Sequence, residues 1–250
     1  MKLIACDPVM GLPRLPLEGL NPDKADLLAE MKRLKIDAAL LRHQTARDAG
    51  PVAGNRAILE DIGDTTSLLG TWFVTPDGLE PDFDLTKMLD DMQAAGVGIA
   101  WTESPKQQFS LLPWCSGELY EALTARQIPL LLEPEKLQYD DLHFVLSDFP
   151  QLRVILTPST RVIGRHRMLY PLLRRHENLM VCLSQIYCVH RGIEDLCHQF
   201  GSHRWVFGMG YPQSEGGAAV TGLMYAEITD EQRLDIGYRN IERLLSEVTK

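Results

Sequence analysis

Arg204-Trp205-Val206-Phe207-Gly208-Met209-Gly210-Tyr211-Pro212 is the stretch that most clearly marks the fold of this chain. Its apolar run, 205–207, predicts a short buried strand, and the glycines and the proline that follow it predict a turn. Glycines have no side chain, so a strand that ends in such a turn can expose its backbone to a cavity at the end of the strand. The rest of the sequence repeats this arrangement of short apolar runs that end in turn-forming residues.

Seven apolar runs precede this stretch, and segments with helical periodicity lie between them. We expect strands over 2–6, 37–41, 68–74, 98–102, 129–133, 152–157 and 179–183, with 205–207 as the eighth. Strands that are apolar throughout, without alternation, are covered on both faces. Eight of them alternating with helices over 250 residues predict an α/β fold, a (β/α)8 TIM barrel with some distortion allowed. Length and apolar content predict one domain over residues 1–250.

Two helix starts can be predicted from their capping residues. Asn21 suits an N-cap and Pro22 suits the first helical position, so a helix is expected to begin there. Near the end of the chain, Thr229 and Gln232 have the spacing of a capping box.

Net charge and cysteine content limit the partners and the location of the protein. A formal net charge of −9 and a pI near 5.3 argue against nucleic acid as a partner, because phosphate binding needs a basic face. The five cysteines are odd in number and most lie in segments expected to be buried, which favours a reduced, cytoplasmic chain. Because no uninterrupted apolar run reaches about 18 residues, we expect no membrane span.

The candidate catalytic residues follow from the barrel itself, because chemistry in such barrels lies at the carboxyl ends of the strands. Asp7 and Glu133 stand at strand ends and can act as an acid or a base if burial raises their pKa values. Ordinary loop carboxylates that cap backbone amides are the alternative. His43 and His190 lie in loops at the same end, where a neutral imidazole can transfer protons. We therefore predict Asp7, Glu133 and His190 as catalytic residues.

Other side chains at the same end of the barrel are candidates for holding a substrate. Arginines supply guanidinium groups, which bind carboxylates and phosphates, and they predict a small anionic molecule as the ligand. Aromatic side chains provide a floor for a planar molecule, although core packing is the alternative for each of them. The predicted substrate-binding residues are His43, Arg47, Trp101, Arg161, Gln185, Arg191 and Tyr211.

Six short segments carry a likeness to a known family, namely 34–40, 54–56, 149–156, 178–184, 204–212 and 240–245. In their order and spacing they resemble the amidohydrolase-related, metal-dependent hydrolase-like TIM barrels. The last strand of that family ends in Phe-Gly-Ser-Asp-x-Pro, and its aspartate is the catalytic base and often a metal ligand. Here Met209 and Gly210 stand where the serine and the aspartate are expected. The resemblance also implies a homo-oligomer formed through exposed helices.

The chain departs from this family at the ends of four strands, where the family binds a metal. Where the family has His-x-His after the first strand, this chain has Asp7 and Val9. The ligand positions of the fifth, sixth and eighth strands hold Glu133, Pro158 and Gly210. The catalysis usual in this family needs imidazole and carboxylate ligands around zinc or a similar ion, and Val9, Pro158 and Gly210 cannot supply them. We therefore expect no metal and no other cofactor.

Two further expectations follow from these departures. A metal site rebuilt from Asp7, Glu133 and His43 is the alternative to a site without metal, because two carboxylates and an imidazole can hold manganese or magnesium. Gly210 is expected to leave space where the aspartate of the family would fit.

Two functions remain open at this point. The first is a metal-independent hydrolase or lyase that acts on a small carboxylate and uses Asp7, Glu133 or His190 for proton transfer. The alternative is a catalytically inactive barrel that binds a small ligand or another protein. The fold alone does not decide between them, because function depends on the site.

Overall fold

The structure, a computed structural model, describes most of the chain. The described residues are 1–12, 22–77, 83–103, 108–133, 137–157, 167–184 and 191–249. Three of the predicted site residues, Arg161, Gln185 and His190, lie outside these ranges, as does Pro158. Their roles stay predictions.

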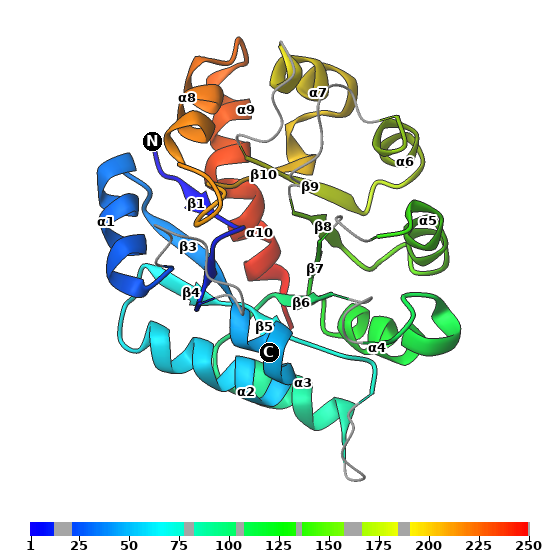
Figure 1. The fold of residues 1–250 in the computed structure, drawn as a ribbon. Coiled ribbons are helices and arrows are strands. Elements are labelled where there is room, and N and C mark those ends of the chain that lie inside the picture. Colours follow the sequence, from blue (N-terminus) through cyan, green and yellow to red (C-terminus); the bar gives the residue numbers. More distant parts are fainter. Residues whose placement is uncertain are drawn as a thin grey trace.

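Within the described ranges, ten short strands form the centre of the molecule (Figure 1). They are β1 (Ile4–Ala5), β2 (Val9–Met10), β3 (Ala38–His43), β4 (Leu68–Gly70), β5 (Trp72–Phe73), β6 (Ala100–Thr102), β7 (Leu130–Leu132), β8 (Val154–Leu156), β9 (Leu179–Leu183) and β10 (Trp205–Phe207). β1, β2 and β4 each pair with β3, and the other six follow one another in the order β10-β9-β8-β7-β6-β5. Every one of these pairs is parallel.

Two backbone connections join these two groups of strands into a closed barrel. At Thr71, between β4 and β5, the chain turns from one group to the other: Thr71 N donates to Leu41 O and Trp72 N donates to Ile99 O, both at 2.9 Å. On the opposite side, Cys6 N donates to Phe207 O at 2.9 Å, which places β1 beside β10. β1 with β2, and β4 with β5, thus each act as one barrel strand, and the predicted (β/α)8 barrel is confirmed.

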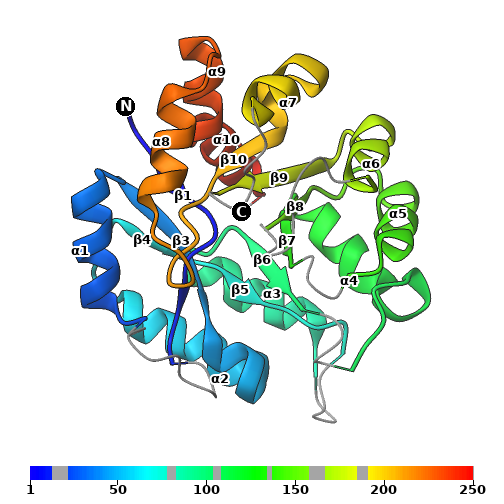
Figure 2. The same cartoon turned by 45° about the horizontal axis from the view of Figure 1, so that its top comes forward.

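Helices surround the strands on the outside of the barrel (Figures 1 and 2). They are α1 (Lys24–Leu34), α2 (Gln44–Ile62), α3 (Leu85–Ala94), α4 (Pro113–Ala125), α5 (Tyr139–Asp148), α6 (Leu169–Arg175), α7 (Gly192–Phe200), α8 (Gly217–Tyr225) and α9 (Asp230–Leu234). A further helix, α10 (Asn240–Glu247), lies across one end of the barrel (Figure 1). In the described part of the chain, none of these helices is both long and apolar enough to cross a membrane.

The structure corrects one predicted helix start and confirms the other. Asp23, not Asn21, is the N-cap of α1, because its side chain accepts a hydrogen bond from Asp26 N at 2.8 Å and Pro22 lies before the helix. At α9 both bonds of the predicted capping box are present between Thr229 and Gln232, at 3.2 Å and 3.0 Å.

The barrel has one apolar core inside the strands and another between the strands and the helices. The inner core includes Leu40, Phe73, Trp101, Leu131, Ile155 and Val206. α10 adds Ile241 and Leu244 to this inner core, and the Asn240 side chain at its start donates to the carbonyl of Trp205, the first residue of β10, at 2.8 Å. α10 therefore lies across the amino end of the barrel (Figure 1), which leaves the carboxyl end as the place for a site.

Candidate active site at the barrel mouth

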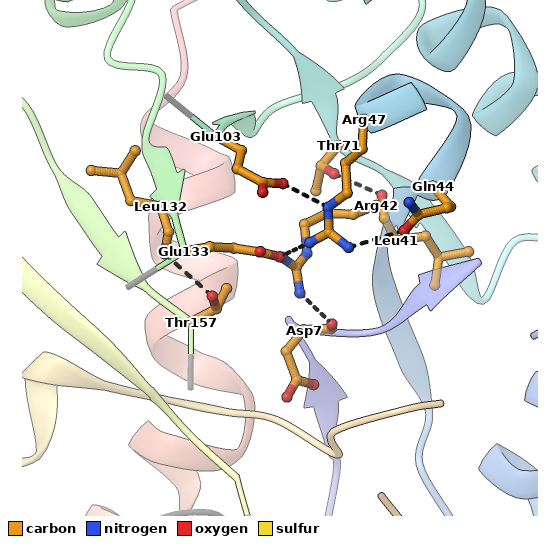
Figure 3. Close-up of polar contacts among 10 residues, drawn as sticks. All are labelled: Asp7, Leu41, Arg42, Gln44, Arg47, Thr71, Glu103, Leu132, Glu133 and Thr157. Carbon is orange, nitrogen blue, oxygen red and sulfur yellow. Dashed lines mark hydrogen bonds and ion pairs between the residues drawn. The ribbon is translucent and has the colours of Figure 1, made fainter. Parts of the chain in front are cut away.

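The alternation of side chains along the strands decides which residues face the mouth of the barrel. Successive side chains of a strand point to opposite faces, so the residue two positions after an inward residue also points inward. Leu40, Trp101 and Leu131 belong to the inner core. Two positions further on stand Arg42, Glu103 and Glu133. With Arg47, at the start of α2, these residues form what we call the mouth cluster (Figure 3).

Arg42 is the most enclosed member of the mouth cluster. Its side chain is 5% exposed, and its Nη2 donates to the backbone carbonyl of Asp7 at 2.7 Å. Its Nη1 donates to Oε1 of Glu133, which extends from the end of β7. Burying a guanidinium group costs less when its donors are paired, and the two Nη pairs of Arg42 join β3 to the ends of β1 and β7.

Arg47 reaches the mouth because α2 is bent. Gly50 has non-helical angles, and the first segment of α2 folds back on the second so closely that a Cβ on Gly54 would lie 2.2 Å from the Ala46 Cβ. From that segment, Arg47 Nη2 donates to the same Glu133 oxygen that accepts from Arg42, and Arg47 Nε lies 2.8 Å from Glu103 Oε2. Positive and negative side chains therefore alternate along one line of contacts, in the order Arg42, Glu133, Arg47 and Glu103.

Trp101 lies beneath both guanidinium groups. The centre of its ring is 5.8 Å from Arg42 Cζ and 5.6 Å from Arg47 Cζ, distances at which a cation and an aromatic face attract each other. The side chain is 1% exposed and packs edge-on against Phe73 at 4.5 Å. Its predicted part in substrate binding would therefore act through the two arginines, because the ring itself is covered.

Asp7 faces the turn after β10. Its two carboxylate oxygens accept hydrogen bonds from Met209 N at 2.7 Å and Gly210 N at 2.9 Å, and Figure 3 shows the carboxylate pointing away from the arginines. Burial raises the pKa of the Asp7 carboxyl above its usual range, against the effect of these two donors. Gly208 permits the contact, since a Cβ there would lie 2.6 Å from Asp7 Oδ2.

The space expected at Gly210 is already filled. A Cβ on Gly210 would lie 2.0 Å from the Ser214 hydroxyl oxygen, and Ser214 N donates to the Gly210 carbonyl at 2.9 Å. The expectation of free space was wrong, because the segment after the turn folds back over it.

The remaining described candidates lie away from the mouth cluster. His43 is buried; its Nδ1 accepts from Thr45 N at 3.1 Å, so its Nε2 carries the hydrogen and lies 2.9 Å from Asp61 Oδ2. The Tyr211 hydroxyl donates to the Asp23 carbonyl at 3.4 Å, and burial raises the pKa of Tyr211 to about 12. Arg191 is exposed at the start of α7 and pairs with Glu227. Their predicted substrate contacts stay predictions.

The sequence predicted site roles for Arg47 and Glu133 but none for Arg42, and it placed Glu103 at a strand end without a role. Arg42 and Glu103 both stand two positions after apolar residues that point inward, so the period of two along the strands is the signal that could have found them. The pairings themselves have no local signal, since Arg42 and Glu133 are 91 positions apart in the chain.

The fold is thus a closed parallel (β/α)8 barrel, and charged side chains gather at the carboxyl end of its strands, where sites lie in such barrels. Residues 15–246 match the sequence profile of the amidohydrolase family, and the chain belongs to that family. Comparison with curated proteins finds no match.

Several solved structures share the fold. A 5-carboxyvanillate decarboxylase from Sphingomonas paucimobilis has a TM-score of 0.74 at 13% identity, with 99% of each chain covered. A 2,6-dihydroxybenzoate decarboxylase from Rhizobium has a TM-score of 0.72 at 15% identity, with 98% of each chain covered. A dihydroxybenzoic acid decarboxylase from a Polaromonas species, solved with manganese and 2-nitroresorcinol, has a TM-score of 0.74 at 12% identity, covering 98% of this chain and 97% of its own. At such identities the likeness shows the fold alone.

The residues of this chain do not fit the metal that such a neighbour holds. Both oxygens of Asp7 accept backbone N–H groups, Glu133 is bound by two arginines, and His43 is turned towards Asp61. Across the described ranges, no three His, Cys, Asp or Glu side chains come together in a way that could hold an ion. Among the described residues the alternative site of Asp7, Glu133 and His43 is therefore not formed, because each of the three side chains is bound to other groups.

Proposed function

We propose that this protein is a metal-independent hydrolase or lyase that acts on a small carboxylate. The observation that carries the proposal is the meeting of two arginines on a single carboxylate oxygen at the mouth of the barrel. Paired guanidinium groups in a partly buried site are the usual means of binding a carboxylate. The neighbours named as decarboxylases act on carboxylates as well, which favours a lyase over a hydrolase.

In this proposal Arg42 and Arg47 hold and orient the substrate carboxylate above the ring of Trp101. Glu133 is the candidate for proton transfer, because it is the carboxylate that both of these arginines contact in the free protein. Asp7 acts as a positioning residue: its carboxylate holds the turn at Met209 and Gly210, and its carbonyl holds Arg42. His190 stays a further candidate for proton transfer.

Binding and turnover of small carboxylates test the proposed function. We expect benzoate and 2,6-dihydroxybenzoate to raise the melting temperature in a thermal-shift screen, because a ligand that binds only the folded protein stabilises it. Each stabilising compound is then assayed for release of carbon dioxide and for hydrolysis of its ester or amide. Stabilisation without turnover of any compound would assign the protein as a binding barrel, and a screen without stabilisation would contradict the carboxylate site.

The proposal also predicts a protein that works without metal. Because Asp7 and Glu133 are bound to other groups and Val9 and Gly210 offer no ligand side chain, protein purified without chelator should contain only trace zinc, manganese or iron. Elemental analysis by mass spectrometry measures this, and dialysis against a chelator should leave the melting temperature and any turnover unchanged. A stoichiometric transition metal in the purified protein would contradict it.

A further inference from the structure

We infer that Glu133 occupies the position of the substrate carboxylate, and that substrate binds by displacing it. Glu133 would then act as an internal competitor that keeps the two arginines paired while the site is empty. This inference rests on the proposed function, since it names the atoms at which that function binds its ligand.

The contacts of Glu133 are those expected of a bound carboxylate. One oxygen, Oε1, accepts from Nη1 of Arg42 and from Nη2 of Arg47, so two guanidinium groups from different elements converge on it (Figure 3). The Glu133 side chain is 17% exposed, against 5% and 9% for the two arginines. Glu133 is thus the most accessible of the three, and it stands at the place where an anion would reach both arginines.

The two arginines have other partners that would hold them in place after Glu133 leaves. Arg42 donates to the Asp7 carbonyl at 2.7 Å. Arg47 lies 2.8 Å from Glu103 and donates to the side-chain oxygen of Gln44 at 3.1 Å. A pair of donors that keeps its geometry without its anion is preorganised for another one, which lowers the cost of binding.

The charge balance of the mouth cluster couples ligand binding to the departure of Glu133. With Glu133 in place, the two arginines are balanced by Glu103 and Glu133. A ligand carboxylate that took the place of Glu133 would keep this balance, whereas one that bound beside it would add a like charge in a poorly solvated place. Replacement of the Glu133 carboxylate by the ligand carboxylate therefore has the lowest electrostatic cost. It predicts a ligand that presents one carboxylate to the mouth cluster.

The test replaces Glu133 with glutamine and measures binding of benzoate and of 2,6-dihydroxybenzoate by calorimetry. Glutamine has a similar shape but no charge, so it competes weakly for the two arginines. If Glu133 fills the ligand position for most of the time in the free protein, its loss raises the fraction of competent sites, and Glu133→Gln should bind the probes about tenfold more tightly or better. The variant should also be less stable than the native protein and should regain stability with added benzoate.

Glu103→Gln is the matched control for this experiment. It removes the same charge from the same cluster, but Glu103 contacts Nε of Arg47 and does not lie where the arginines converge. If both variants bound the probes more tightly to the same degree, the effect would come from the change in net charge, and the inference would be overturned. Unchanged or weaker binding by Glu133→Gln would overturn it as well.

A second variant and the turnover assay separate this inference from the proposed function. Glu133→Asp keeps the charge but shortens the side chain, so it should also tighten binding if Glu133→Gln fails to fold. Tighter binding by the Glu133 variants without turnover by the native protein would support the inference and refute the enzyme. Binding and turnover by the native protein, without tighter binding by either variant, would refute the inference alone. No binding by any of these proteins would refute both.

Discussion

Replacing Arg42 with methionine is expected to lower the free energy of unfolding by about 3–5 kcal/mol, which is the range for removing one partner of a buried ion pair. The side chain is 5% exposed, and its loss would leave the Asp7 carbonyl without this donor and Glu133 with one guanidinium fewer. Methionine has a comparable length and fills the space without charge. Urea unfolding followed by fluorescence measures the change, and carboxylate binding should be lost in the same variant.

The control for this prediction combines Arg42→Met with Glu133→Gln. The double variant removes one positive and one negative charge, so Arg47 and Glu103 remain as a balanced pair. Replacing both members of an ion pair costs much less than removing one, and the double variant should recover a large part of the lost stability. A loss below about 1 kcal/mol in the single variant would show that the pair is as weak as a surface salt bridge.

Replacing Gly54 with alanine is expected to destabilise the protein by about 3 kcal/mol or more, at or above the upper end of the range for overpacking. The new Cβ would lie 2.4 Å from Ala46 Cα and 2.6 Å from Ala46 N, and these backbone atoms cannot move without shifting the first segment of α2. Because Arg47 follows Ala46 directly, the same shift should weaken carboxylate binding. Chemical denaturation and calorimetry measure the two effects.

Two comparisons make this prediction specific. Ala46→Gly in the Gly54→Ala background removes one methyl group but leaves the backbone overlap, so it should restore only a small part of the stability. Gly222→Ala, on α8, places its Cβ in open space and should stabilise the protein by about 0.5–1 kcal/mol, as expected for glycine to alanine in a helix. If Gly54→Ala were as well tolerated as Gly222→Ala, the result would contradict the close contact between Gly54 and Ala46 within α2.

The strands could be predicted from the sequence because each one is a local apolar run. The run 205–207 coincides with β10, and all the other expected runs overlap a barrel strand. The start of α1 was less predictable, since Asn21 and Asp23 are equally good N-caps and the helix begins after the second. The bend of α2 at Gly50 has a local signal, because Gly50-Pro51 is a pair that interrupts helices, whereas no local pattern indicates the close packing of Gly54 against Ala46.

The candidate site was predictable in part. Asp7, Arg47 and Glu133 were found because they follow strands, and the barrel places all strand ends at one mouth. The direction in which each side chain points was not predictable in the same way. The Asp7 carboxylate accepts from the backbone after β10, whereas the Glu133 carboxylate accepts from the arginines. The residues next to Asp7 and Glu133 in the sequence do not predict either direction.

The sequence by itself determined the barrel, the end at which the candidate site lies, and the departure from the family pattern at Val9 and Gly210. These are consequences of residue type and of short periodic patterns, which act over a few residues. Only the tertiary structure decided that Arg42 and Arg47 meet on Glu133, across 91 and 86 positions of chain. The physical reason is that closure of the barrel brings β3, α2 and β7 to one mouth. Burying a charge there costs less beside a charge of opposite sign.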